Sequence, residues 1–477
     1  KRNLKQRTKP LWRVPMLKKK TKQEKILFWA AVIMTAAACS ISLMSILGVD
    51  PHLCPDEIMR YDVAEWIFKN NRLPWGNEPE LISAWGFNYS LAPYLPTIVS
   101  VLFMKITALF TENQWALFAA FRMPSLLSHL CIGIFAYLTA RRLFKGSGSK
   151  ICFLAFSLFW PQIFYLASYL NNDIFALALC YGIFFCWVYG LQEGWDWKAV
   201  VGFGVILGML TITYYYAYGW ILCSIIFFCF TMWKQKKSVS EFWIKTGSVA
   251  GVAFIVGGWF FIKNALFMPW DFLGFQATDV YRTMYAIDTV KNIPIPYEYQ
   301  SLGQMIFGAN PVPWWITTLR SYIASYQLYT VVPSTKQYLA LIVFLVPSFF
   351  AGLVKAWQSF CSRNSQKKML VVCEVLAFGI PIFLTIFSSY YIDYQPQGRY
   401  FISSLPVLVL WISFGWQKIS TWINALLQKF GFQKHLPIAA CMGIGFALLG
   451  TYIYLRLNWA VLFKMLPYFG QYYIRPF

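Results

Sequence analysis

The sequence predicts an all-α polytopic membrane protein, and three observations support this prediction. Hydrophobic residues make up 58% of the 477 residues and charged residues only 13%, whereas a soluble domain carries about 25% charged residues. The apolar residues are gathered into a series of segments nearly free of charge, long enough for membrane-spanning helices. Lys and Arg outnumber Asp and Glu by 41 to 19, and they cluster in alternate connecting segments, as expected where those segments stay in the cytoplasm.

The N-terminal segments set the predicted orientation. Residues 1–25 form a basic tail with eleven Lys or Arg and a single acid, which the positive-inside rule assigns to the cytoplasm. The first span, 26–49, contains no charge and leads to the extracytoplasmic face. Hydropathy alone would make 92–110 the second span. Two prolines and Lys105 interrupt it, and counting it would place the later basic loops outside, so we predict an interfacial helix there.

The remaining spans complete one membrane domain, 26–477, of about eleven transmembrane helices. They are predicted at 116–140, 151–170, 174–191, 199–215, 219–233, 247–268, 338–357, 369–388, 401–416 and 436–454. Two outer segments are long enough to build a site: a catalytic outer loop at about 50–115 and a second at about 269–337. In this topology the formal net charge of +22 reflects orientation and attraction to anionic membrane lipids, and we expect no nucleic-acid partner.

Acidic residues on the outer face are the candidates for catalysis. Asp56 and Glu57 start an amphipathic helix just after the first span. They either stabilise the helix dipole or provide a general base with a neighbouring acid. Asp173 lies in the short outer turn Asn171-Asn172-Asp173, where local hydrogen bonding is the ordinary role of these residue types. Asp173 and Asp56 are also candidate ligands of a divalent cation such as Mg²⁺ or Mn²⁺.

Basic residues near the outer ends of spans are the candidates for binding a lipid phosphate. Arg399 lies in Gln397-Gly398-Arg399-Tyr400, just before the span at 401–416. An Arg at this depth either reaches out to lipid headgroups or makes bidentate hydrogen bonds to a bound phosphate. The same alternatives apply to Arg122 and Lys263, and Arg60 lies one turn after the acidic pair.

Several short motifs follow one another along most of the chain. They are Pro55-Asp56-Glu57 with Arg60-Tyr61, the segment 85–96, Phe121-Arg122-Met123-Pro124-Ser125, Arg141-Arg142-Leu143-Phe144, Asn172-Asp173, Lys263-Asn264 and Gln397-Gly398-Arg399-Tyr400. Their order and predicted placement resemble the GT-C superfamily of membrane glycosyltransferases, especially its protein-mannosyltransferase-like and aminoarabinose-transferase-like branch. One departure is Thr213, which precedes Tyr214 where many relatives have Lys, so the phosphate contacts are expected elsewhere.

The resemblance implies a GT-C fold with amphipathic interfacial helices in the first outer loop. It implies transfer of a sugar from a polyprenyl-phosphate-linked donor to a hydroxyl of an acceptor glycan, lipid or protein, by an inverting single displacement. The expected catalytic residues are Asp56 as base with Glu57 and Asp173, and the expected phosphate-binding residues are Arg399, Arg122, Lys263 and Arg60.

The alternative function is a lipid-linked sugar transporter. Such a protein should carry charges near the membrane midplane and inverted repeats, whereas the notable charges here cluster at one face and no repeat is evident. We therefore expect an integral protein of a bacterial plasma membrane, with its N-terminus in the cytoplasm and an extracytoplasmic active site.

Overall fold

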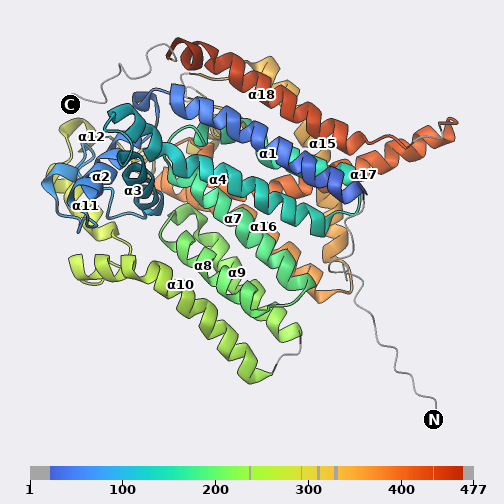
Figure 1. Ribbon diagram of the computed structural model, residues 1–477, viewed down its shortest axis with the longest axis horizontal. Helices are drawn as coiled ribbons and strands as arrows, with labels where there is room; N and C mark the ends of the chain where they lie inside the picture. Colours follow the sequence, from blue (N-terminus) through green and yellow to red (C-terminus); the bar gives the residue numbers. More distant parts are fainter. Residues whose placement is uncertain are drawn as a thin grey trace.

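The structure is a computed structural model that describes residues 22–235, 238–291, 293–308, 312–326, 331–432 and 435–465. Within these ranges the chain forms helices and two isolated β-bridges but no strand, which confirms the all-α prediction. The long helices run side by side along one direction of the molecule (Figure 1). Most of the predicted basic tail, 1–25, lies outside the described residues.

Nine of the described helices are long and apolar enough to cross a membrane. They are α1 (Lys22–Gly48), α4 (Gln114–Leu143), α7 (Asn172–Gln192), α9 (Tyr218–Lys234), α10 (Val239–Phe267), α15 (Thr335–Phe360), α16 (Ser365–Tyr391), α17 (Leu405–Lys429) and α18 (Ile438–Met465). Side-chain caps fix where several begin. Asn113 accepts a hydrogen bond from Ala116 N at 3.1 Å before α4, and Ser334 and Gln337 form a capping box at α15.

Two predicted spans correspond to shorter helices. The segment 151–170 forms α5 (Ser147–Leu158) and α6 (Pro161–Leu166), and the break precedes Pro161 because proline fits only the first turn of a helix. The segment 199–215 contains α8 (Trp197–Thr211), whose 15 residues extend about 22 Å. That length is less than the ~30 Å thickness of the hydrocarbon core. Helices therefore stand at every predicted span, although these do not all reach full membrane length.

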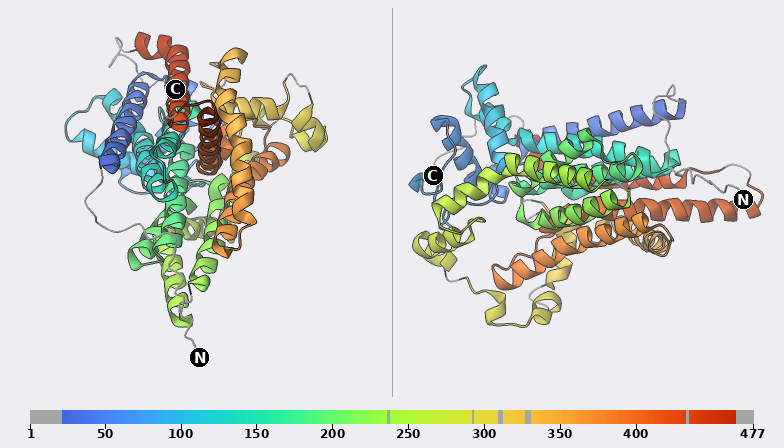
Figure 2. Two further views of the ribbon diagram at one scale, coloured as in Figure 1. Left: turned by 90° about the vertical axis from the view of Figure 1, so that its right-hand side faces the viewer. Right: turned by 90° about the horizontal axis from the view of Figure 1, so that it is seen from below.

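The predicted interfacial helix is α3 (Leu95–Ala108). Its 14 residues extend about 21 Å, too little to cross a membrane. It packs on α2 (Glu57–Asn70) and on α4. Figures 1 and 2 place α2 and α3 at one end of the bundle, together with α11 (Phe275–Tyr285) and α12 (Asp288–Lys291). The two predicted outer segments thus meet at the same end, and the length of α3 agrees with an interfacial position.

The site at this end is built on the starts of α2 and α7 and on a 3-10 segment, η5 (Gly398–Ser404), that leads into α17. Helix α7 is buried along nearly its whole length and packs against α4, α8, α9 and α17. The segment η5 packs against α7, α16 and α14 (Trp314–Ile323), which follows α13 (Leu302–Phe307). The backbone under the candidate residues is therefore held by the centre of the bundle.

Candidate active site

Asp56 is the residue immediately before α2, and its backbone has the left-handed conformation with φ 62°. This conformation costs a non-glycine L-residue roughly 1–2 kcal/mol, and Asp and Asn tolerate it better than most residues. The Asp56 side chain makes no capping hydrogen bond to α2. Its carboxylate instead accepts a hydrogen bond from Tyr89 Oη at 3.1 Å and contacts Arg399 Nη2 at 3.3 Å. The structure therefore does not support a role limited to capping the helix.

Asp173 approaches the same guanidinium from α7. Its Oδ2 lies 3.8 Å from Arg399 Nη1. The cap of α7 is Asn171, which accepts from Ile174 N at 2.9 Å, so Asp173 is not needed for that purpose. The residue is only 3% exposed, and its Oδ1 has no hydrogen-bond partner. Because buried polar atoms are nearly always paired, this oxygen can take a donor either from the nearby Tyr214 hydroxyl, which is also unpaired, or from a bound molecule.

Arg399 lies between the two carboxylates, with its side chain 9% exposed. Its Nε donates to Gln397 Oε1 at 2.6 Å, which orients the guanidinium plane. The contacts to Asp56 and Asp173 are longer than the 2.7–2.9 Å typical of charge-assisted hydrogen bonds. The two Nη groups therefore keep capacity for another anion.

Gly398 positions Arg399 by allowing η5 to pack closely on α14, a role that the sequence did not indicate. A Cβ on Gly398 would collide with the backbone of α14 at Tyr322 N and Thr318 O, and Gly398 N donates to Ser321 Oγ at 2.7 Å. The glycine therefore permits close packing of η5 on α14.

Arg60 and Tyr89 complete the cluster on the α2 side. Arg60 Nη1 donates to Asn172 Oδ1 at 2.8 Å, and its guanidinium lies over the Tyr89 ring, 5.4 Å from the centroid. Burial, together with the charge of Asp56, raises the pKa of Tyr89 well above its ordinary value. The Tyr89 hydroxyl thus stays protonated and remains a donor to Asp56.

Glu57 and Arg122, by contrast, are turned away from this cluster. Arg122 Nε and Nη2 donate to the two carboxylate oxygens of Glu57 at 2.8 and 2.6 Å, and both side chains have no exposed surface. Arg122 Nη1 donates to the carbonyls of Ile46 and Val49, and Leu170 N donates to Glu57. The pair joins the end of α1 to α2, α4 and the turn before α7. These contacts leave neither residue placed for the catalytic and phosphate-binding roles expected from the sequence.

Lys263 is also engaged with the protein. Its Nζ donates to Ser90 O at 2.7 Å, and the neighbouring Asn264 donates to Leu91 O at 3.1 Å. The two residues anchor on α10 the loop that carries Tyr89. Lys263 therefore supports the site indirectly, and no contact joins it to Arg399.

Aromatic residues that the sequence did not single out for a role line the other side of Arg399. The Tyr400 ring lies 5.0 Å from the guanidinium carbon and stacks on Tyr216 at a centroid distance of 4.9 Å. Tyr216 Oη in turn donates to Ser388 Oγ at 2.7 Å. The sequence signal for Tyr216 was its position two residues after Tyr214, where only the absence of a Lys was noted.

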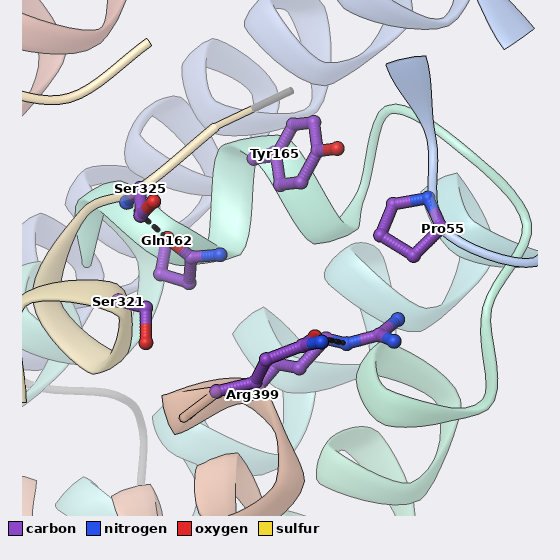
Figure 3. Close-up of a pocket in the computed structure, with 7 residues that line it drawn as sticks. Pro55, Gln162, Tyr165, Ser321, Ser325 and Arg399 are labelled. Carbon is purple, nitrogen blue, oxygen red and sulfur yellow. Dashed lines mark hydrogen bonds between the residues drawn. The ribbon is translucent and has the colours of Figure 1, made fainter. Parts of the chain in front are cut away.

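A small cavity of about 20 Å³ lies beside Arg399 (Figure 3). The residues drawn include Pro55, Gln162, Tyr165 and Ser325, and Gln162 Oε1 accepts from Ser325 N at 2.7 Å. This volume holds about one water and no sugar ring. A substrate must therefore reach Arg399 from the side on which the Asp56 side chain is 31% exposed.

Asp56 and Asp173 give only part of the donor set for the divalent cation that the sequence suggested. Asp56 and Asp173 supply two carboxylates, but the described residues contain no group of three or more His, Cys, Asp or Glu that could hold a metal ion. The Arg399 guanidinium already lies within 3.8 Å of both carboxylates, where a bridging cation would have to lie. Two carboxylates would also leave most Mg²⁺ ligands to water and substrate oxygens. The group that lies between the two carboxylates in this structure is the Arg399 guanidinium.

Comparison with known proteins gives one family match and several similar folds. Residues 95–259 match the family described as Dolichyl-phosphate-mannose-protein mannosyltransferase; no curated protein sequence matches the chain. The apo oligosaccharyltransferase of Archaeoglobus fulgidus has a TM-score of 0.52 and 13% identity, over 91% of this chain and 56% of its own. Apo ArnT from Cupriavidus metallidurans has a TM-score of 0.50 and 13% identity, over 92% and 77%. ArnT from the same organism bound to undecaprenyl phosphate has a TM-score of 0.48 and 14% identity, over 90% of this chain and 76% of its own.

The likeness to the first two structures concerns the fold, because their identity to this chain is only 13%. The chain spans little more than half the length of the oligosaccharyltransferase. The family match covers α3 through most of α10, including the turn that carries Asp173. The fold predicted from the sequence is confirmed: the chain is an integral membrane protein whose helices are arranged as in these two structures, and residues 95–259 match the protein-mannosyltransferase family model over part of the chain.

Proposed function

We propose that this protein is a glycosyltransferase that moves a sugar from a polyprenyl-phosphate-linked donor to an acceptor hydroxyl. The observation that carries the proposal is the Asp56–Arg399–Asp173 cluster at the end of the bundle, in which one carboxylate is partly exposed and the guanidinium is incompletely engaged. The description of the matching family, which names dolichyl-phosphate-mannose, supports a lipid-phosphate sugar as donor.

Asp56 is the proposed general base. The acceptor oxygen attacks the anomeric carbon while its proton passes to the Asp56 carboxylate, and the bond from that carbon to the phosphate oxygen breaks with both electrons going to the phosphate. A single displacement of this kind inverts the anomeric configuration. Tyr89, whose hydroxyl donates to Asp56 Oδ1, fixes the orientation of the carboxylate. The other oxygen, Oδ2, has only the 3.3 Å contact to Arg399 Nη2 and is the proposed proton acceptor once that contact is released.

Arg399 is the proposed binding group for the leaving phosphate. The departing polyprenyl phosphate is a stable anion and needs electrostatic stabilisation rather than protonation. A guanidinium presents two parallel N–H groups that match two phosphate oxygens. When the phosphate takes these donors, Asp56 loses its long contact to Arg399 and becomes a stronger base. Arg60, held by Asn172 at 2.8 Å, adds positive charge on the other side of Tyr89.

The proposed active site faces the extracytoplasmic side, in a bacterial plasma membrane. The basic connecting segments lie at the opposite ends of the helices, which the positive-inside rule assigns to the cytoplasm. No nucleotide sugar is available outside the cytoplasm, which favours a donor already carried across the membrane by its lipid. The acceptor glycan, lipid or protein then has to be recognised by the two outer segments.

The test is sugar transfer by the purified full chain in lipid vesicles, with radiolabelled dolichyl-phosphate mannose as the first of a panel of polyprenyl-phosphate sugars. The readout is free polyprenyl phosphate, which forms only when the anomeric bond is cleaved. Asp56→Asn is nearly isosteric and keeps a residue that tolerates positive φ. We expect it to retain donor binding and to lose roughly 10²–10⁴-fold in turnover.

Asp279→Asn, the same change at an exposed position of α11 at the same end of the bundle, is the matched control and should remain fully active. Near-wild-type turnover by Asp56→Asn would refute the assignment of the base. Movement of intact donor across the vesicle without release of polyprenyl phosphate would instead identify a transporter.

A further inference from the structure

A second cavity, of about 410 Å³, opens among α7, α15, α16 and α17. It is far from the candidate active site. Helix α7 begins at Asn172, beside Asp173, and ends at Gln192, which lines this cavity. Its 21 residues separate the two places by about 30 Å. The cavity therefore lies at the opposite end of the bundle, and the proposed reaction does not use it.

The chemistry of the cavity lining is divided by depth. The mouth carries Lys145 from the connection after α4, Lys355 from α15 and Lys367 from α16. The connecting segments around it are those that the positive-inside rule assigns to the cytoplasm. Deeper in, the walls are apolar and include Val188 from α7 and Leu410 from α17.

One acidic side chain lies on the wall, away from the helix ends. Glu374 is 4% exposed and lines the cavity, and Trp411 Nε1 donates to its Oε2 at 3.1 Å. It is seven residues, or about 10 Å along α16, from Lys367. A phosphate would be attracted by the lysines at the mouth, whereas the carboxyl group at that depth offers it no positive partner. The electrostatics thus orient an anionic amphiphile with its phosphate at the mouth and its hydrocarbon inside.

We propose that this cavity takes the headgroup and part of one acyl chain of an anionic phospholipid of the cytoplasmic leaflet. Its volume lies in the range of ~300–1,000 Å³ typical of small-molecule sites. Basic pockets between transmembrane helices on the cytoplasmic side are known to take the headgroups of anionic lipids. A free phosphate would use the lysines and leave the apolar walls unoccupied, whereas a zwitterionic lipid would gain little from three positive charges. An anionic lipid uses both parts of the lining.

The test is lipid binding to the full-length protein by native mass spectrometry, titrating short-chain phosphatidylglycerol against short-chain phosphatidylcholine. The triple variant Lys145→Gln, Lys355→Gln, Lys367→Gln should bind phosphatidylglycerol about fivefold more weakly for each lysine removed, and on the order of a hundredfold in total. The matched control removes three lysines that are exposed and do not line the cavity: Lys198→Gln, Lys368→Gln, Lys429→Gln. It should leave the affinity unchanged.

A filling variant separates a lipid from free phosphate. Leu370→Trp places a large side chain in the cavity from its partly exposed wall. It should reduce phosphatidylglycerol binding while the lysines remain. Equal loss in the two triple variants, or equal binding of the two lipids, would overturn the proposal. If inorganic phosphate at the same concentration as the lipid prevents phosphatidylglycerol binding, and Leu370→Trp has no effect on that binding, the cavity is a site for soluble phosphate and not for a lipid.

Discussion

Replacing Arg399 by Lys keeps the positive charge and removes the fork geometry. In the structure Arg399 Nε contacts Gln397 at 2.6 Å, while Nη2 and Nη1 face Asp56 at 3.3 Å and Asp173 at 3.8 Å. These three contacts point in different directions in one plane. A lysine amine at the end of a flexible chain cannot present two parallel N–H groups to a phosphate, nor can it keep the contact to Gln397 at the same time.

The size of the effect follows from the burial of the side chain. Arg399 is 9% exposed, so water screens its contacts little. A hydrogen bond to a charged group contributes ~1.5–3 kcal/mol. If the lysine in the Arg399→Lys variant retains one of the two hydrogen bonds to the leaving phosphate, kcat/KM should fall roughly ten- to a hundredfold. Because the lost hydrogen bond strengthens as charge develops on the phosphate, kcat should fall more than KM rises.

The assay is the release of polyprenyl phosphate at limiting and at saturating donor, alongside thermal unfolding of each variant. Arg320→Lys is the matched control, because Arg320 is an exposed arginine on α14, which packs under η5. We expect Arg320→Lys to behave as wild type. A folded Arg399→Lys protein with kcat/KM within twofold of wild type would show that Arg399 does not bind the leaving phosphate bidentately.

Three further outcomes are expected. Glu57→Gln leaves Arg122 charged in a dry interior and should lower the free energy of unfolding by ~3–5 kcal/mol. The double variant Glu57→Gln, Arg122→Met should recover part of that loss. An unchanged unfolding midpoint in Glu57→Gln would show that the Glu57–Arg122 pair does not stabilise the fold. Gly398→Ala should lower the unfolding temperature and transfer together, because its Cβ collides with the α14 backbone; full activity would show that η5 can shift. Cysteines placed at Asn113 and at Ser147 should react with an impermeant thiol reagent from outside at the first position only, and the reverse pattern would invert the topology.

The fold was predictable because its signals are local. Apolar length and the distribution of Lys and Arg identify spans without knowledge of any contact. The segment that forms α3 was separated from the predicted spans by its prolines and by the charge distribution. The sequence predicted that Asp56, Asp173 and Arg399 share one face of the membrane, since each was predicted at an outer helix end. Their distances were not, because these depend on how α2, α7 and η5 pack.

The different contacts of the two neighbouring acids, Asp56 and Glu57, could not be predicted from the sequence. Asp56 and Glu57 are adjacent, and nothing in their order indicates which one enters the cluster with Arg399. The left-handed φ of Asp56 turns its side chain toward Tyr89, while Glu57, on the first turn of α2, faces α4. The same ambiguity applied to the arginines: Arg122 and Arg399 were both predicted near outer helix ends, and only the packing shows that Arg122 is paired bidentately with Glu57.

The two acid–arginine pairs therefore have complementary tasks. The Glu57–Arg122 pair has short bidentate contacts, no exposed surface and additional hydrogen bonds to the backbone of α1 and of the turn before α7. These hydrogen bonds hold the start of α2 in place. The Asp56–Arg399 pair, one residue away on α2, has a longer contact and a partly exposed carboxylate. A strained and incompletely paired residue at the start of a helix persists only when its surroundings hold it, and the buried pair provides that support. Loosening Glu57–Arg122 should consequently reduce transfer through Asp56 even in molecules that remain folded.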